Sequence, residues 1–339
     1  MLRYLEKLCS LRGVSGDERE VREYIKAEVG PYSDNVDEDV LGNLIVFKKG
    51  KKTPKKRIML CAHMDEVGVI ITDITESGFL KFAEVGGMDR RAIIGKAVLL
   101  GKSGVFGVIG CRATHLTKRD ERDKIPKTED MYIDIGVKSR ADAEKLVSPG
   151  DTGTFDTRYA GFGSGFVKAR ALDDRAGCAV MMELIRSDLP VDCAFAFTVQ
   201  EEVGTRGAFV AASRIQPDIA LVIETTTAAD FPDVRADKKV CAVDGGVVIP
   251  FMDGGAIYDR ELFYLLTGVA EKNGIKWQTK TVIAGGNDAS AVQRSGGGAR
   301  VLAISVPVRN LHAPACVMSL SDFDAQLRLC SLFLDAMGD

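Results

Sequence analysis

Strand-like and helical segments alternate over most of this 339-residue chain, and that alternation constrains its fold more than any other feature. Before residue 66 and after residue 166, short apolar runs such as RIMLCA (57–62) and RVLAISV (300–306) have the composition of buried strands. Helical periodicity predicts the helices around them, at 3–12, 18–29, 174–187, 207–213, 259–273 and 322–337. Alternating strands and helices predict an α/β fold with a mainly parallel central sheet flanked by helices.

The block between these two regions has a different pattern. Residues 67–165 contain several short strand-like runs separated by glycines, and one helix is expected near 140–147. Such a block favours a small, mostly-β module inserted into the α/β domain. The expected division is therefore residues 1–66 and 166–339 in one domain and 67–165 in the other.

Three pairs of residues have the spacing of a helix capping box, in which the first side chain caps the helix that follows. These pairs are Ser15 with Glu18, Ser139 with Asp142, and Ser321 with Asp324. Gly274 is expected to end the 259–273 helix.

Composition excludes several classes of protein. Hydrophobic residues are 46% and charged residues 27% of the chain, and its net charge is −3, which gives no reason to expect a nucleic-acid or membrane partner. The chain has no apolar run long enough to span a bilayer and no signal-peptide pattern at its start. Its eight cysteines are scattered without a CxxC pair, which favours a reducing, cytoplasmic location.

Acidic and imidazole side chains follow the predicted strands at the point where each ends. In open α/β sheets, ligands bind beyond the carboxyl ends of the strands, so these side chains are expected to meet at one edge. They are His63, Asp65, Asp173, Asp174, Glu201, Glu202, Glu224 and His312. Two of the three histidines of the chain belong to this set.

Imidazole and carboxylate ligands together suit zinc or a similar divalent ion. Several carboxylates in one small cavity need compensating charge, which two divalent cations would supply. His63 and Asp65 point to the same face of a strand, so Asp65 can accept a hydrogen bond from the ring nitrogen that does not bind metal. Glu201 and Glu202 are adjacent and diverge, so one can bind metal while the other acts as a general base.

Four segments closely resemble one known family. AHMDEVG (62–68), ALDDRAG (171–177), QEEVGTRGA (200–208) and VRNLHAP (308–314) are similar to motifs of the tetrahedral aminopeptidases, metallo-aminopeptidase family forty-two. That family includes proteins named glutamyl aminopeptidase and endoglucanase M. The resemblance covers nearly the whole chain and implies hydrolysis of N-terminal residues from peptides.

The resemblance also implies roles for the site residues. A dinuclear zinc or cobalt centre would have Asp173 as the bridging ligand. His63 and Glu224 would complete one ion, and Glu202 and His312 the other. Glu201 would be the general base that moves a proton from water to the leaving amine, and Asp65 would orient His63. As in related enzymes, the Asp173–Asp174 peptide bond is expected to be cis.

One residue departs from the family pattern, which usually has Asp where this chain has Glu224. Asp230 is an alternative ligand if Glu224 does not bind. For Asp174, a helix cap or a supporting role is favoured over direct metal binding. Asn287 and Asp288, in GGNDASA (285–291), could contact substrate or form a glycine turn and a helix cap.

The inserted block would resemble the family's PDZ-like dimerisation domain. The resemblance implies dimers that build a hollow dodecamer. Two other functions remain open: a two-metal acyl-amino-acid deacylase, or a catalytically silent assembly protein on the same scaffold. Glycoside hydrolysis is disfavoured because it usually uses two metal-free carboxylates. The sequence does not predict which N-terminal side chain is preferred.

Overall fold

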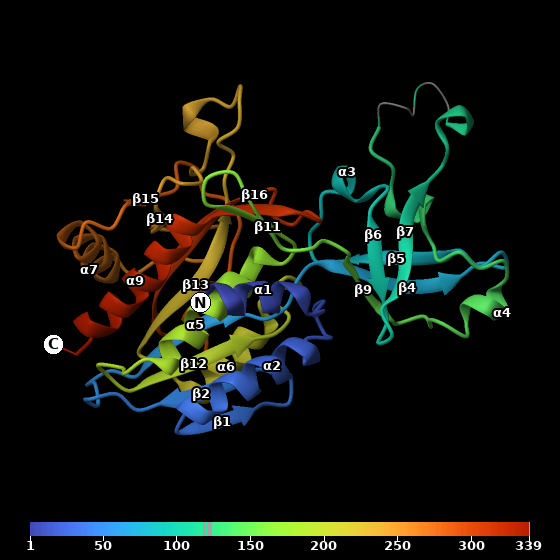
Figure 1. The fold of residues 1–339 in the computed structure, drawn as a ribbon. Helices are drawn as coiled ribbons and strands as arrows, with labels where there is room; N and C mark the ends of the chain where they lie inside the picture. The colour runs from blue at the N-terminus through green and yellow to red at the C-terminus, as the bar shows by residue number, and fades with distance from the viewer. Residues whose placement is uncertain (118–119, 121–123, 339) are drawn as a thin grey trace.

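The computed structural model describes residues 1–117, 120 and 124–338. Its larger body is built on a mixed sheet (Figure 1). The order of the strands across this sheet is β1 (Asn35–Glu38), β2 (Leu44–Lys48), β12 (Cys193–Thr198), β3 (Ile58–His63), β13 (Ile219–Thr227), β16 (Arg300–Arg309), β17 (Cys316–Ser319), β11 (Phe166–Ala169) and β10 (Ala160–Phe162). Two short strands, β14 (Val247–Val248) and β15 (Trp277–Gln278), extend from β16.

The centre of this sheet is parallel. β12, β3, β13 and β16 pair in parallel, whereas the strands beyond them on both edges pair antiparallel. Every residue of β3 is buried, as expected of a strand covered on both faces. The carboxyl ends of the four central strands therefore meet at one edge.

Helices cover both faces of the sheet. They are α1 (Leu2–Ser10), α2 (Arg19–Val29), α5 (Leu172–Arg186), α6 (Arg206–Ile215), α7 (Arg260–Lys272), α8 (Ala289–Gln293) and α9 (Leu320–Ala336). α5 packs on β3 and β13 and is itself contacted by α1, α2 and α9. α6 and α8 pack together on the face that α5 leaves open, so the parallel strands lie in the main hydrophobic core.

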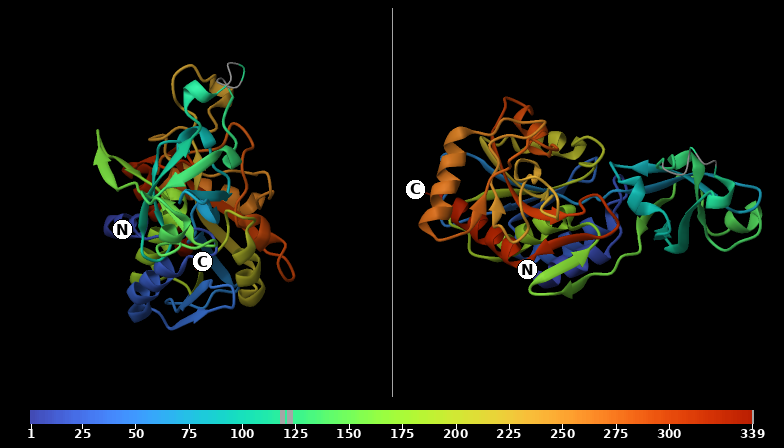
Figure 2. Two further views of the ribbon diagram at one scale, coloured as in Figure 1. Left: turned by 90° about the vertical axis from the view of Figure 1, so that its right-hand side faces the viewer. Right: turned by 90° about the horizontal axis from the view of Figure 1, so that it is seen from above.

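The middle of the chain forms a closed six-stranded barrel beside the larger body (Figures 1 and 2). The order of strands around it is β4 (Gly68–Ile74), β5 (Leu80–Val85), β8 (Met131–Asp134), β7 (Val105–Cys111), β6 (Ala97–Leu100) and β9 (Thr152–Phe155). Two short helices, α3 (Arg90–Ile93) and α4 (Arg140–Ala143), accompany it. The barrel encloses a hydrophobic core separate from that of the larger body.

A buried ion-pair network stands where the chain leaves the larger body for the barrel. Glu66 pairs with Arg170 and, at 3.4 Å, with Arg175, and all three side chains are almost fully buried. Arg175 also donates to the carbonyl of Leu8 at 2.6 Å. The network thus joins the end of β3, the start of α5 and the N-terminal helix.

The predicted α/β class is confirmed, and the six predicted helices of the larger body are present with ends shifted by a few residues. The Ser139 cap and the left-handed Gly274 after α7 are also present. Three local predictions are wrong. α4 ends at Ala143 rather than near 147, and β10, assigned above to the 67–165 block, pairs within the larger sheet.

The third wrong prediction concerns two capping boxes. Ser15 does not cap α2, because its hydroxyl donates to Asp65 at 2.6 Å. Glu18 accepts from the N–H groups of Gly16 and Gln200 instead of from that of Ser15. α9 is capped by Ser319 rather than Ser321.

All eight cysteines are free thiols, and seven are buried. In the described residues, no helix combines the length and the apolar character that a bilayer crossing requires.

Gly207, near the start of α6, packs closely against the backbone of Val199 and the side chain of Asn43. A methyl group on its α-carbon would overlap the carbonyl oxygen of Val199 and the side-chain oxygen of Asn43. We expect Gly207→Ala to lower the free energy of unfolding by about 1–3 kcal/mol, as overpacking does. Gly268→Ala on α7 is the matched control, because no atom lies within 4 Å of its added methyl group. It should leave stability unchanged or raise it by about 0.5–1 kcal/mol. Equal urea midpoints for the two variants would contradict this reading.

Candidate metal centre

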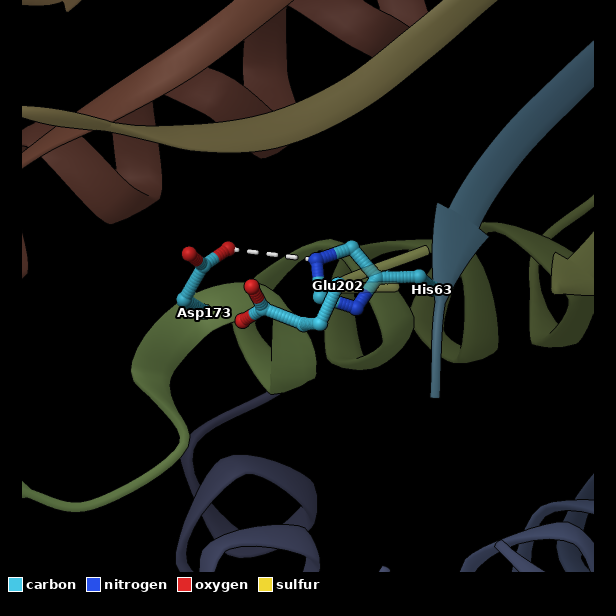
Figure 3. A group of neighbouring side chains, drawn as sticks. All are labelled: His63, Asp173 and Glu202. Atoms are coloured by element: carbon cyan, nitrogen blue, oxygen red, sulfur yellow. Dashed lines mark hydrogen bonds and ion pairs between the residues drawn. The ribbon is translucent and has the colours of Figure 1, made fainter. Parts of the chain in front are cut away.

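Five segments bring acids and imidazoles to the carboxyl edge of the parallel strands. His63 is the last residue of β3, Glu201 and Glu202 follow β12, and Glu224 lies in β13. Asp173 lies at the start of α5, whose N-terminus faces this edge, and His312 is in the loop after β16. Figure 3 shows His63, Asp173 and Glu202 directed toward one another.

Asp173 lies between the two imidazoles. Its Oδ1 is 3.2 Å from Nε2 of His63, and its Oδ2 is 3.2 Å from Nε2 of His312. Each carboxylate oxygen therefore faces a different imidazole, which is the arrangement required of a ligand shared between two ions.

The remaining acids stand around these imidazoles. From Nε2 of His63, Oε1 of Glu224 is at 3.7 Å and Oε2 of Glu201 at 3.9 Å. Oε2 of Glu202 lies 3.3 Å from Nε2 of His312. Two sets of ligand atoms are close enough to share an ion: His63 with Asp173 and Glu202, and His63 with Asp174 and Glu224.

The other nitrogen of His63 faces Asp65. Nδ1 lies 3.1 Å from the carbonyl oxygen of Asp65 and 3.4 Å from its Oδ1. A proton on Nδ1 therefore leaves Nε2 free to bind a cation among the acids.

Asp65 also holds the backbone of the loop that carries Glu201 and Glu202. Its Oδ1 accepts from the N–H of Glu201 at 3.0 Å, and its Oδ2 from the N–H of Glu202 at 3.1 Å and from the hydroxyl of Ser15. The two preceding N–H groups are held in the same way. Glu18 accepts from Gln200 at 3.1 Å, and Asn43 accepts from Val199 at 3.0 Å. Four successive amides of this loop thus end on side chains from the N-terminal 65 residues.

Burial and mutual repulsion perturb the acids strongly. Burial, followed by the charge of Asp173, raises the pKa of Glu202 to about 8. Burial also raises the pKa of Glu201 and Glu224 well above the ordinary value, and neighbouring carboxylates add to both shifts. Burial lowers the pKa of His312, but the hydrogen bond with Asp173 and the charge of Glu202 more than offset this and bring it to about 9. The acids therefore lack compensating positive charge.

The donor set fits divalent cations. Imidazole nitrogen and carboxylate oxygen are ligands for zinc and similar ions, and metal charge would relieve the repulsion among the acids. A further oxygen is available, because Oδ2 of Asp174 is buried without a hydrogen-bond partner. Oδ1 of the same residue accepts from the N–H of Gly177 at 2.9 Å, as a helix cap does.

Three other residues singled out in the sequence have hydrogen-bond or ion-pair partners of their own. Asp230 forms a bidentate ion pair with Arg309 at 2.6–2.7 Å, which occupies both of its oxygens. Asn287 lines the cavity but is bonded to the hydroxyl of Tyr258 and the N–H of Ala289. Asp288 is buried and accepts from Thr198 at 2.5 Å. The Asp173–Asp174 peptide bond is cis, as predicted.

A cavity of about 150 Å³ opens onto the centre. Its polar walls include His63, Asp173, Glu201, Glu224 and His312. Thr225 and Lys280 also line it, and the sequence reasoning identified neither. The sequence also does not reveal that Ser15, Glu18 and Asn43 support the site, because their contacts join segments far apart in the chain.

A buried edge of acids and imidazoles on an α/β sheet is an arrangement that could hold divalent metal ions, as in metal-dependent hydrolases. Comparison with known proteins names the family. Residues 42–329 match the model of the M42 glutamyl aminopeptidase family, so this chain belongs to that family and is a peptide-bond hydrolase.

Three similar proteins illustrate the match. A putative aminopeptidase of Acetivibrio thermocellus is 40% identical, over 97% of each chain. The lysyl aminopeptidase of Pyrococcus furiosus is 28% identical, over 98% of this chain and 96% of its own. The structure of the Pyrococcus horikoshii TET1 peptidase, described as able to assemble into a tetrahedron or a large octahedral shell, superposes with a TM-score of 0.85 at 37% identity. It covers 97% of this chain and 98% of the other.

The pKa shifts predict that the metal-free protein loses stability as pH rises. Burial raises the pKa of Glu18 to about 7, and those of Glu202 and His312 are about 8 and about 9. All three exceed their unfolded values of about 4.3 for Glu and about 6.5 for His, so the folded state binds more protons. Stability is then complete below the unfolded pKa and is lost as pH rises through about 7–9.

Urea unfolding of chelator-treated protein between pH 6 and pH 9 would measure this loss. We expect the free energy of unfolding to fall over that range, and to fall less steeply in Glu18→Gln because one titrating group is removed. A free energy that stays constant or rises would show that the acids are not buried as described.

Proposed function

We propose that this protein is a metal-dependent aminopeptidase that removes N-terminal residues from peptides, with two divalent ions, zinc or cobalt, per chain. The observation that carries the proposal is the position of Asp173, each of whose oxygens lies 3.2 Å from a different imidazole. Family membership supports the aminopeptidase activity.

In this proposal Asp173 would be the ligand shared by the two ions. His63 and Glu224 would hold one ion, and Glu202 and His312 would hold the other. When bound, the ions would polarise the scissile carbonyl and lower the pKa of the attacking water toward about 7. The resemblance implies an Asp where this chain has Glu224. The Glu224 carboxylate lies 3.7 Å from Nε2 of His63, which supports it as the ligand over Asp230.

Glu201 is the proposed general base. Its carboxylate faces the same cavity as Asp173 and His63, and burial raises its pKa, as befits a group that must accept and return a proton. It would take a proton from the attacking water and give it to the leaving amine. Asp65 would orient His63 and fix the backbone of Glu201 at the same time.

Asn287 and Asp288 are weaker proposals for substrate contact. Asn287 lines the cavity, which supports it, although its side chain is already hydrogen bonded. Asp288 is buried, accepts from Thr198 and is not part of the cavity lining, so a supporting role fits it better.

The chain is also proposed to assemble with itself through the 67–165 block, which would act as a PDZ-like dimerisation domain. Exposed apolar side chains on β7 support an interface there: Phe106 is 55% and Val108 38% exposed. The assembly of the TET1 peptidase into a tetrahedron or an octahedral shell supports self-assembly, and the proposed form for this chain is dimers that build a dodecamer. Eight free thiols support a cytoplasmic location.

The activity can be tested on aminoacyl-p-nitroanilides and short peptides after loading with Zn²⁺ or Co²⁺. We expect release of the N-terminal residue that is lost on chelation and restored by metal. N-acylated peptides serve as the comparison, because a deacylase on the same site would prefer the blocked amine. Activity only on blocked substrates, or none on either kind, would refute the proposal.

Glu201→Gln tests the role of the base. The amide keeps the shape of the side chain but cannot accept the proton, so we expect kcat to fall by about 10²–10⁴-fold. Metal content and assembly should be unchanged, because Glu201 is not a proposed ligand. Wild-type kcat in a metal-loaded Glu201→Gln protein would remove the residue from this role, and a silent assembly protein would show no turnover in either form.

A further inference from the structure

The loop between α1 and α2 (residues 12–18, the connecting loop) is bonded to the barrel at two points. The first is Arg12, whose guanidinium donates to the carbonyl oxygens of Gly101 at 2.5 Å and of Lys102 at 2.8 Å, in the turn between β6 and β7. Nε of Arg12 donates to Glu20 of α2 at 3.1 Å, so the larger body also orients the guanidinium. Figure 1 shows the connecting loop on the side of the larger body that faces the barrel.

The second point is Asp17. The hydroxyl of Thr152, the first residue of β9, donates to Oδ2 of Asp17 at 2.9 Å. The N–H of Gly101 donates to the carbonyl of Thr152 at 2.8 Å, so both points lie on one small part of the barrel. A cavity of about 30 Å³ lies here between the barrel and the larger body, and Arg12, Asp17 and Thr152 are among the residues that line it. The contact is therefore polar and incompletely packed, and its geometry depends on these hydrogen bonds.

Other residues of the connecting loop hold the backbone of the proposed base. Ser15 donates to Oδ2 of Asp65 at 2.6 Å, and Oδ1 of Asp65 accepts from the N–H of Glu201 at 3.0 Å. Glu18 is 3% exposed and accepts from the N–H of Gln200 at 3.1 Å. One short loop therefore contacts both the barrel and the loop that carries Glu201.

The backbone between these contacts is itself held. The N–H of Glu66, which lies just before the first barrel strand β4, donates to the carbonyl of Gly13 at 2.9 Å. The N–H of Ser15 donates to the carbonyl of Glu66 at 3.3 Å. The N–H of Gly16 donates to the side chain of Glu18 at 2.7 Å. A loop held at successive residues has few alternative conformations, so a shift of its barrel contacts would also move Ser15 and Glu18.

We propose that Arg12 and Asp17 are positioning residues for the reaction. Through them the barrel fixes the connecting loop, which in turn fixes the backbone of Glu201. This inference rests on the proposed function, since it concerns the general base. Neither Arg12 nor Asp17 belongs to the lining of the catalytic cavity, and both act through the connecting loop and Asp65. Their loss should therefore change the orientation of the base, which lowers kcat, and leave substrate binding and KM largely unchanged.

Two substitutions test this role from opposite sides of the contact. Arg12→Met removes the hydrogen bonds to the β6–β7 turn, and we expect kcat of the metal-loaded protein on its best aminoacyl-p-nitroanilide to fall by about tenfold or more, with KM within about twofold. Thr152→Val removes the bond to Asp17 with little change of shape, and kcat should fall by less because one neutral donor is lost. Arg12→Lys keeps the charge and one donor position, so it should recover part of the activity.

Arg19→Met is the matched control. Arg19 is exposed at the start of α2 and lines the same small cavity as Arg12. Within the described part of the chain, its side chain has no hydrogen bond or ion pair. The substitution should leave kcat and KM at their wild-type values.

Hydrogen–deuterium exchange gives a readout that does not depend on turnover. In Arg12→Met the amides of residues 199–202 should exchange about tenfold or more faster than in the wild type, with or without bound metal, because their acceptors are less firmly held. The amides of β3 and β13 should keep their wild-type rates, since the strand pairing of the larger sheet is unchanged.

The outcomes separate this role from the proposed function. Wild-type kcat and wild-type exchange at 199–202 in both variants would overturn the role of Arg12 and Asp17. A lower kcat with faster exchange throughout the larger body would reduce the effect to a loss of stability, which also overturns it. A wild-type protein that cleaves no substrate contradicts the proposed function, whereas the exchange of residues 199–202 still decides whether the barrel holds this loop.

Discussion

The repulsion among buried carboxylates at the carboxyl edge of the sheet is the constraint on which the rest of the structure depends. Asp173 and Glu224 are at most 8% exposed, and Glu201 and Glu202 stand beside them. The two imidazoles compensate only part of this charge, as the raised pKa values of the three glutamates indicate. Added cations would stabilise the charged form of such an edge, and the parallel strands hold these side chains close together.

The N-terminal segment has a direct part in the site. Side chains from residues 15–65 accept hydrogen bonds from the four successive N–H groups that lead to Glu202. Asp65 is the centre of this arrangement, because it also faces the non-ligating nitrogen of His63. One carboxylate therefore aligns a proposed ligand and the proposed base, which links the position of α2 and its preceding loop to catalysis.

The helices and strands of the larger body could be predicted from the sequence, because hydrophobic periodicity depends on local structure. The placement of acids and imidazoles after strands predicts that His63, Glu202 and His312 meet, because parallel strands end at a common edge. Asp173 joins them from the start of α5. Sequence spacing predicts wrongly where a side chain bonds to a residue distant in the chain. The spacing of Ser15 and Glu18 predicts a helix cap, but Ser15 donates to Asp65 and Glu18 accepts from Gln200. Lys280 and Thr225 carry no local signal, because only the folding of the 225–285 region brings them to the same cavity.

The most direct test of this account is the number and place of the bound cations. Elemental analysis of protein prepared with excess Zn²⁺ or Co²⁺, together with anomalous scattering from its crystals, would locate them. The account predicts two ions per chain, one beside each oxygen of the Asp173 carboxylate. Fully active protein with no ion at Asp173, or with its ions bound elsewhere, would contradict it.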